Sequence, residues 1–120
     1  FCFDQIANGR RVEEGEHFYR RHPKWSLLGK TLRDAQAALD AIAQQPDLDA
    51  SRVYVVGFAL GATTALHLAA IDDRPAGYAL VAPPAPFRLD PADGPYGGLR
   101  RWYHDLAYLP NLGAFAADDL

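Results

Sequence analysis

The sequence predicts an α/β fold of parallel strands flanked by helices, and three observations point to it. Residues 52–56 (RVYVV) are almost continuously apolar and β-branched, which is typical of a parallel strand covered on both faces. Residues 77–82 form a second run of this kind. The segment between them, 60–71, is rich in alanine and leucine and predicts a helix. Strand, helix, strand is the order of a parallel βαβ unit.

The first 25 residues predict little regular structure. Residues 1–3 (FCF) indicate the end of a buried strand, and residues 4–10 predict the loop that follows it. Residues 11–25 are polar, charged and aromatic without a helical or strand period, so we expect a loop there too. Because the chain starts within an expected strand and contains no methionine, we also expect that its natural N-terminus is missing.

A long amphipathic helix is predicted after this loop. Its apolar positions recur at steps of 4, 3, 4 and 3, which places them on one helix face. They are Leu28, Leu32, Ala35, Leu39 and Ile42. Ser26 is a candidate N-cap. Pro46 should end the helix, because the residue before a proline disfavours helical geometry.

Composition excludes several classes of function. The chain has 120 residues, one expected domain and a net charge of −3, with acids and bases mixed along it. We therefore expect neither a nucleic acid nor a membrane as partner. No apolar run approaches the roughly 18 residues that cross a bilayer. Cys2 is the single cysteine, so no internal disulfide can form. We expect no metal and no cofactor, while compartment and oligomeric state stay open.

Residues 57–61 carry the most specific motif of the chain. They have the G-x-S-x-G frame of a nucleophile elbow, in which a strained central residue stands exposed between a strand and a helix. Any side chain at either glycine is expected to collide with its neighbours. The central position holds alanine instead of serine. A tight turn without chemistry is the alternative. The five positions are Gly57, Phe58, Ala59, Leu60 and Gly61.

The wider sequence resembles the α/β-hydrolases. Residues 49–66 are similar to the central segment of the branch that contains dienelactone hydrolases and acetyl xylan esterases. Residues 4–9 (DQIANG) resemble the D-x-x-G-x-G loop of these enzymes, with Ala7 in place of one glycine. The resemblance covers residues 1 to about 90. It implies a partial α/β-hydrolase fold, truncated at both ends, with a βαβαβ core at 1–86 and a cap-like or lid-like segment at 87–120.

The resemblance also assigns roles. In this family a serine at the position of Ala59 attacks an ester carbonyl, and the next backbone N–H, here of Leu60, holds the oxyanion. The Asp and His partners follow later in such chains, and nothing here matches them. The histidines are poor substitutes, since two precede the elbow, one lies on the next helix and one is in the aperiodic tail. They are His17, His22, His67 and His104.

The resemblance therefore implies a serine esterase lineage acting on small-molecule esters, inactive in this chain because Ala59 occupies the nucleophile position and the Asp and His partners are absent. A non-catalytic binding or scaffold module that uses the hydrolase pocket is the alternative. The alanine itself has three possible origins: an engineered trap, a natural pseudoenzyme or a sequence variant.

The remaining motifs are weaker evidence for a function than the elbow. Gly29, Lys30 and Thr31 resemble the end of a P-loop, but the motif needs glycine at position 24, which is Lys24. The acidic pairs at 72–73 and 118–119 lack metal-ligand spacing, and we expect them to be a solvated helix end and a tail. The basic and aromatic residues 100–104 predict a surface helix or a cap over the pocket.

Overall fold

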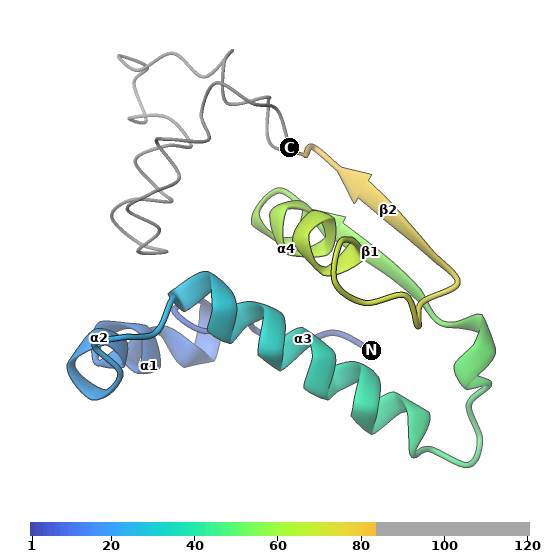
Figure 1. The fold of residues 1–120 in the computed structure, drawn as a ribbon, viewed down its shortest axis with the longest axis horizontal. Coiled ribbons are helices and arrows are strands. Elements are labelled where there is room, and N and C mark those ends of the chain that lie inside the picture. Colours follow the sequence, from blue (N-terminus) through green and yellow to red (C-terminus); the bar gives the residue numbers. More distant parts are fainter. Residues whose placement is uncertain (84–120) are drawn as a thin grey trace. The chain divides into compact units, whose positions relative to one another are not determined.

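The computed structural model describes residues 1–83, and these belong to two compact units, residues 1–30 and residues 31–83. The predicted cap at 87–120, including residues 100–104, residues 118–119 and His104, lies outside the described residues (Figure 1).

Three short helices lie between residues 9 and 21 of the first unit. They are η1 (Gly9–Arg11), α1 (Val12–Glu16) and α2 (Phe18–Arg21). The prediction of a loop over 11–25 was wrong here, because helices of four or five residues are too short to display a 3.6-residue period. Local interactions hold them instead. Arg11 pairs with Glu14 at 2.7 Å, and Phe18 is buried with only 2% of its surface exposed.

Residues 1–3 do not form the strand that was predicted. All three are exposed, and Phe1 has 89% of its surface accessible. No other segment of residues 1–30 is a strand, so these residues have no ladder to join within their unit. The apolar composition alone therefore did not produce a strand.

The loop at residues 4–9 contains two residues with positive φ. Ala7 has φ of 68° and Gly9 has φ of 53°, so both lie in the left-handed region. Gly9 also lies against the carboxylate of Asp4, which accepts a hydrogen bond from Arg10 N–H at 3.0 Å. A side chain at position 9 would overlap that carboxylate.

Helix α3 (Leu27–Ala43) confirms the predicted amphipathic helix. Ser26 Oγ accepts a hydrogen bond from Gly29 N–H at 3.3 Å, as an N-cap does. Leu28, Ala35 and Leu39 are buried at the expected spacing. In the second unit, Ala35 and Leu39 join Leu68 in the core.

The second unit contains a parallel two-stranded sheet, which is a partial α/β fold. Strand β1 (Tyr54–Phe58) pairs with β2 (Gly77–Val81), and helix α4 (Leu60–Ala69) connects them (Figure 1). Strand β1 starts two residues later than predicted, because the short helix η2 (Ala50–Arg52) precedes it. The small residues of α4 pack closely, and Ala62 is completely buried.

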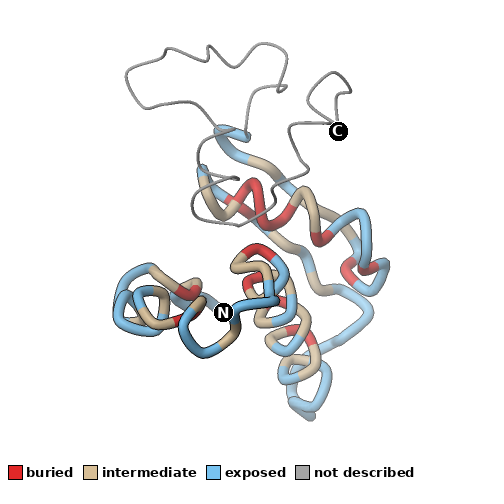
Figure 2. Tube along the Cα trace, turned by 60° about the vertical axis from the view of Figure 1, so that its left-hand side comes forward, coloured by how far each residue is buried: buried red, intermediate tan, exposed pale blue. Residues whose placement is uncertain are grey.

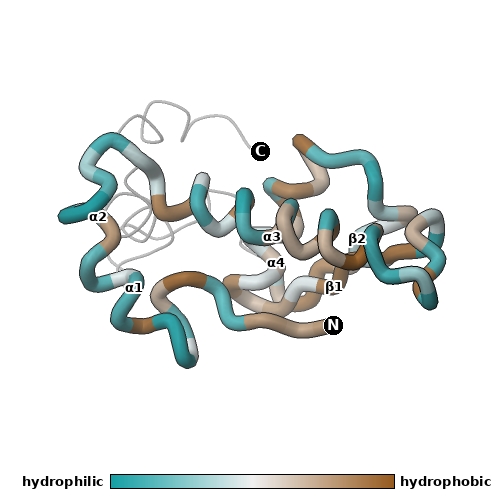
Figure 3. Tube along the Cα trace, turned by 90° about the horizontal axis from the view of Figure 1, so that it is seen from below, coloured by the Kyte–Doolittle hydropathy of each residue, from teal (hydrophilic) through white to brown (hydrophobic). Residues whose placement is uncertain are grey.

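Within residues 31–83, helices cover one face of the sheet, whereas cover on both faces was predicted. Helices α3 and α4 supply the core residues that pack against Val55 and Tyr78, which are register partners in the sheet. Figure 2 shows that the buried positions of this unit lie mainly on its helices. On the other face of β1, Tyr54, Val56 and Phe58 have 67–70% of their surfaces exposed. The strands are mainly apolar (Figure 3), yet Gly57 is the one residue in them that is buried.

No helix within residues 1–83 has both the length and the apolar character needed to cross a bilayer.

Candidate active site

Ala59 lies between the end of β1 and the start of α4 in the strained conformation expected of an elbow. Its φ is 49° and its ψ is −112°. A positive φ is uncommon outside glycine, and this ψ lies far from the left-handed helical basin. The residue is exposed. The turn thus holds a side chain out at the carboxyl end of the parallel strands, where ligands of such sheets bind.

Hydrogen bonds fix the backbone of Ala59 on both sides. Its N–H donates to the Val81 carbonyl of β2 at 3.0 Å. Its own carbonyl accepts from Ala62 N–H at 2.9 Å and from Thr63 N–H at 3.1 Å. These bonds join the turn to the neighbouring strand and to the first turn of α4, and they maintain the unusual dihedral angles.

The Leu60 N–H is the donor that the elbow leaves open. Among the described residues it has no acceptor, as is usual for the first N–H groups of a helix. It follows Ala59 directly and belongs to a ten-residue helix whose amino end carries partial positive charge. This is the arrangement in which a backbone donor stabilises a developing oxyanion.

The two glycines of the motif differ in the space that a Cβ atom would have. A Cβ at Gly57 would overlap the carbonyl group of Gly61 and lie 2.7 Å from Ala62 Cα, so β1 and α4 approach as closely as predicted. A Cβ at Gly61 would meet nothing within 4 Å. The predicted collision at Gly61 was therefore wrong, because this residue points away from the strand that Gly57 belongs to.

The structure brings no histidine of the second unit to Ala59. His67 is half-buried on α4, two turns further on, and its Nδ1 lies 2.8 Å from the Thr63 carbonyl. His17 and His22 belong to the first unit, where His22 stacks on Trp25 with ring centroids 4.8 Å apart. In residues 1–83 no three His, Cys, Asp or Glu side chains cluster as a metal site would require.

An ion cluster away from the elbow was not predicted. Asp72 was expected to be solvated, but only 7% of its surface is exposed. Arg74 donates to both of its carboxylate oxygens, at 2.8 and 2.6 Å, and also to Asp40 of α3 at 2.5 Å. Gln36 reaches Asp72 at 3.5 Å, and Tyr78 Oη donates to its carbonyl at 2.8 Å.

Charge pairing explains the ionisation of this cluster. The Arg74 guanidinium, opposed by burial, lowers the pKa of Asp72 to about 2. Asp72 and Asp40 together raise the pKa of Arg74 above its ordinary value. Burial, followed by the Asp72 charge, raises the pKa of Tyr78. The cluster ties α3 to the segment that enters β2 and has no contact with the elbow. A separation of two residues between an Asp and an Arg was the available signal, but it occurs in many exposed turns.

Comparison with known proteins agrees with this geometry. Residues 7–86, two thirds of the chain, match the family model described as the dienelactone hydrolase family. Searches of curated proteins and of solved structures returned no match.

Proposed function

This chain belongs to the dienelactone hydrolase family, and from that premise we propose that it descends from serine esterases and does not itself hydrolyse esters. Ala59 then occupies the nucleophile position, and the Leu60 N–H is one oxyanion donor. The substrate class of the lineage is small-molecule carboxylic esters.

The backbone of Ala59 carries this proposal. An ordinary strand-to-helix turn has no reason to hold an alanine at φ 49° and ψ −112°. An elbow does, because this conformation presents the central side chain to substrate. The neighbouring open N–H of Leu60 fits the same purpose.

The inactivity follows from the methyl group. Alanine has no lone pair with which to attack a carbonyl and no proton for a base to remove. In a serine protease the loss of the serine alone reduces turnover by a factor of about 10⁶. Binding and oxyanion stabilisation that remain supply only a small part of the acceleration.

A non-catalytic binding module is the second candidate. The exposed Ala59 and the open Leu60 N–H would suit a carbonyl or carboxylate oxygen of a ligand that is held without turnover. The same features support both candidates, so the two must be separated by experiment.

The test compares the unaltered protein with its Ala59→Ser variant in the longest natural reading frame that contains this chain. Hydrolysis of p-nitrophenyl acetate and butyrate is measured for both, with Ala37→Ser on the exposed side of α3 as a matched control. We expect the unaltered protein and the control to hydrolyse these esters equally slowly. A gain of at least about 100-fold in Ala59→Ser over both supports the esterase lineage, because the serine of a complete catalytic set is worth a factor of about 10⁶ in turnover.

Two results would go against the proposal. Hydrolysis by the unaltered protein at a rate typical of an active serine esterase would show that Ala59 is not a lost nucleophile. No gain in a folded Ala59→Ser variant would favour the binding module.

A further inference from the structure

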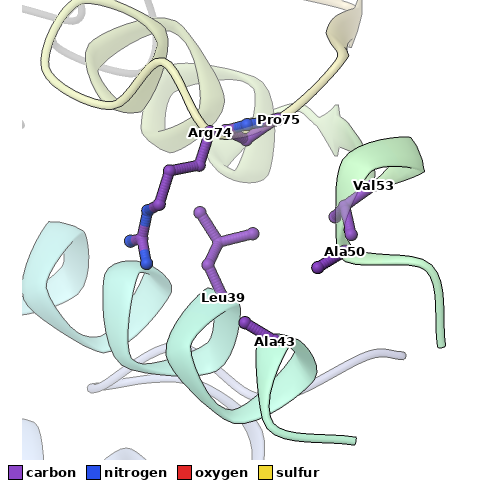
Figure 4. Close-up of a pocket in the computed structure, with 6 residues that line it drawn as sticks. All are labelled: Leu39, Ala43, Ala50, Val53, Arg74 and Pro75. Carbon is purple, nitrogen blue, oxygen red and sulfur yellow. The ribbon is translucent and has the colours of Figure 1, made fainter. Parts of the chain in front are cut away.

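The second unit has a hollow that is separate from the elbow. It lies where the parallel strands begin, whereas Ala59 lies where β1 ends. Its volume is about 250 Å³. The lining residues come from α3, η2 and the segments that enter the two strands (Figure 4). They are Leu39, Ala43, Ala50, Val53, Arg74 and Pro75.

The walls of this hollow are apolar, and its rim is open. Leu39 and Pro75 are buried and Val53 is half-buried, while Ala43 and Ala50 are exposed. Figure 4 shows the branched end of Leu39 directed into the space between Arg74 and Val53. The space exists because Ala43 and Ala50 are small where α3 and η2 face each other. A cavity of about 150 Å³ with apolar walls is large enough for benzene.

The one charged residue of the lining is already neutralised. Nε and Nη2 of Arg74 donate to Asp72, and Nη1 donates to Asp40. Nη2 also reaches the Gln36 carbonyl at 3.5 Å. Asp40 in turn lies 4.0 Å from Arg33. Two guanidinium groups and two carboxylates therefore balance, and an entering anion would have to compete with carboxylates that are already bound.

We propose that this hollow is a binding site for a small, uncharged aromatic or aliphatic group, separate from the elbow. The apolar walls give the affinity, since the burial of a ring releases it from water. The ion cluster sets the selectivity, because its positive and negative charges balance, so an ammonium or a carboxylate ion finds no uncompensated opposite charge there. One remaining Nη1–H of Arg74 can donate to a hydroxyl or carbonyl oxygen of the ligand.

Three probes of similar size that differ in charge test the selectivity. Benzyl alcohol, benzoate and benzylammonium are titrated into the 120-residue chain, and the methyl resonances of Leu39 are followed by NMR. We expect benzyl alcohol to bind with a Kd of about 1 mM or below, in the range of a small efficient ligand, and at least tenfold more tightly than either ion. Equal or tighter binding of an ion would overturn the proposed selectivity, and the absence of saturable shifts with all three would overturn the site.

Matched variants of α3 test the location. Ala43→Leu fills the hollow from its rim and should weaken benzyl alcohol binding at least tenfold. Ala37→Leu, exposed on the same helix but outside the lining, should leave it unchanged. Circular dichroism checks that both variants fold, and Ala50→Leu replaces Ala43→Leu if that variant does not. Unchanged binding in the filled variant, or equal loss in both, would overturn the proposal.

Discussion

Ala59→Gly should stabilise the protein, although replacement of alanine by glycine usually does the opposite. The dihedral angles of Ala59, φ 49° and ψ −112°, are unfavourable for a residue with a Cβ atom. Glycine adopts such mirror-image conformations freely. Since Ala59 is exposed, the lost methyl group gives up almost no burial.

The magnitude follows from two opposing terms. Backbone strain of this kind costs on the order of 1–3 kcal/mol. Glycine increases the entropy of the unfolded chain, which costs about 0.4–1 kcal/mol. The net gain is therefore about 1 kcal/mol, and it corresponds to a rise of about 4 °C in Tm for a chain of this size.

Urea unfolding followed by circular dichroism measures the change. The control is Ala37→Gly in the exposed middle of α3, which has ordinary helical geometry and should lose about 1 kcal/mol. The two variants should thus shift the urea midpoint in opposite directions at an unchanged m value. If Ala59→Gly destabilises the protein as much as Ala37→Gly does, the turn is not strained and the elbow interpretation fails with it.

Three further predictions concern the same turn and the ion cluster. Gly57→Ala should cost several kcal/mol because its methyl would overlap the backbone of Gly61, whereas Gly61→Ala should be neutral or stabilising; equal effects in urea unfolding would contradict the close approach. The lowered pKa of Asp72 means that its stabilisation is complete above its ordinary pKa of 3.8 and is lost as the pH falls through about 2. At 1.36 kcal/mol per pKa unit this is about 2 kcal/mol, which should appear as the difference between the pH–stability curves of the unaltered protein and Asp72→Asn; parallel curves would refute it. In a Cys2→Ser background, the thiol of Ala59→Cys should titrate below about 8.5 because it lies at the start of α4, as measured by the pH dependence of alkylation, while Ala37→Cys should not.

The sequence was most informative where local chemistry decides the structure. The apolar spacing of α3 and its Ser26 cap, the small residues of α4 and the elbow frame all depend on neighbours within one or two turns.

Two of the errors concern contacts between distant segments. The apolar composition of β1 does not show whether helices cover one face of the sheet or both, because a helix on either face packs against the same types of apolar residue. Burial of Asp72 depends on Asp40 and Gln36, which are more than 30 residues away and have no sequence link to it. The side chains that would complete a catalytic set are likewise chosen by tertiary structure.

The uncovered face of β1 has a practical consequence for work with this chain. The window of residues 53–58 (VYVVGF) combines high β-propensity with no charge and no proline, and the side chains of Tyr54, Val56 and Phe58 lie in water. Segments of this kind add to one another as cross-β stacks. At high concentration the purified 120-residue chain should be prone to aggregate. Val56→Lys should reduce this aggregation, because it places a charge in the exposed apolar window, and it leaves residues 57–61 of the elbow unchanged.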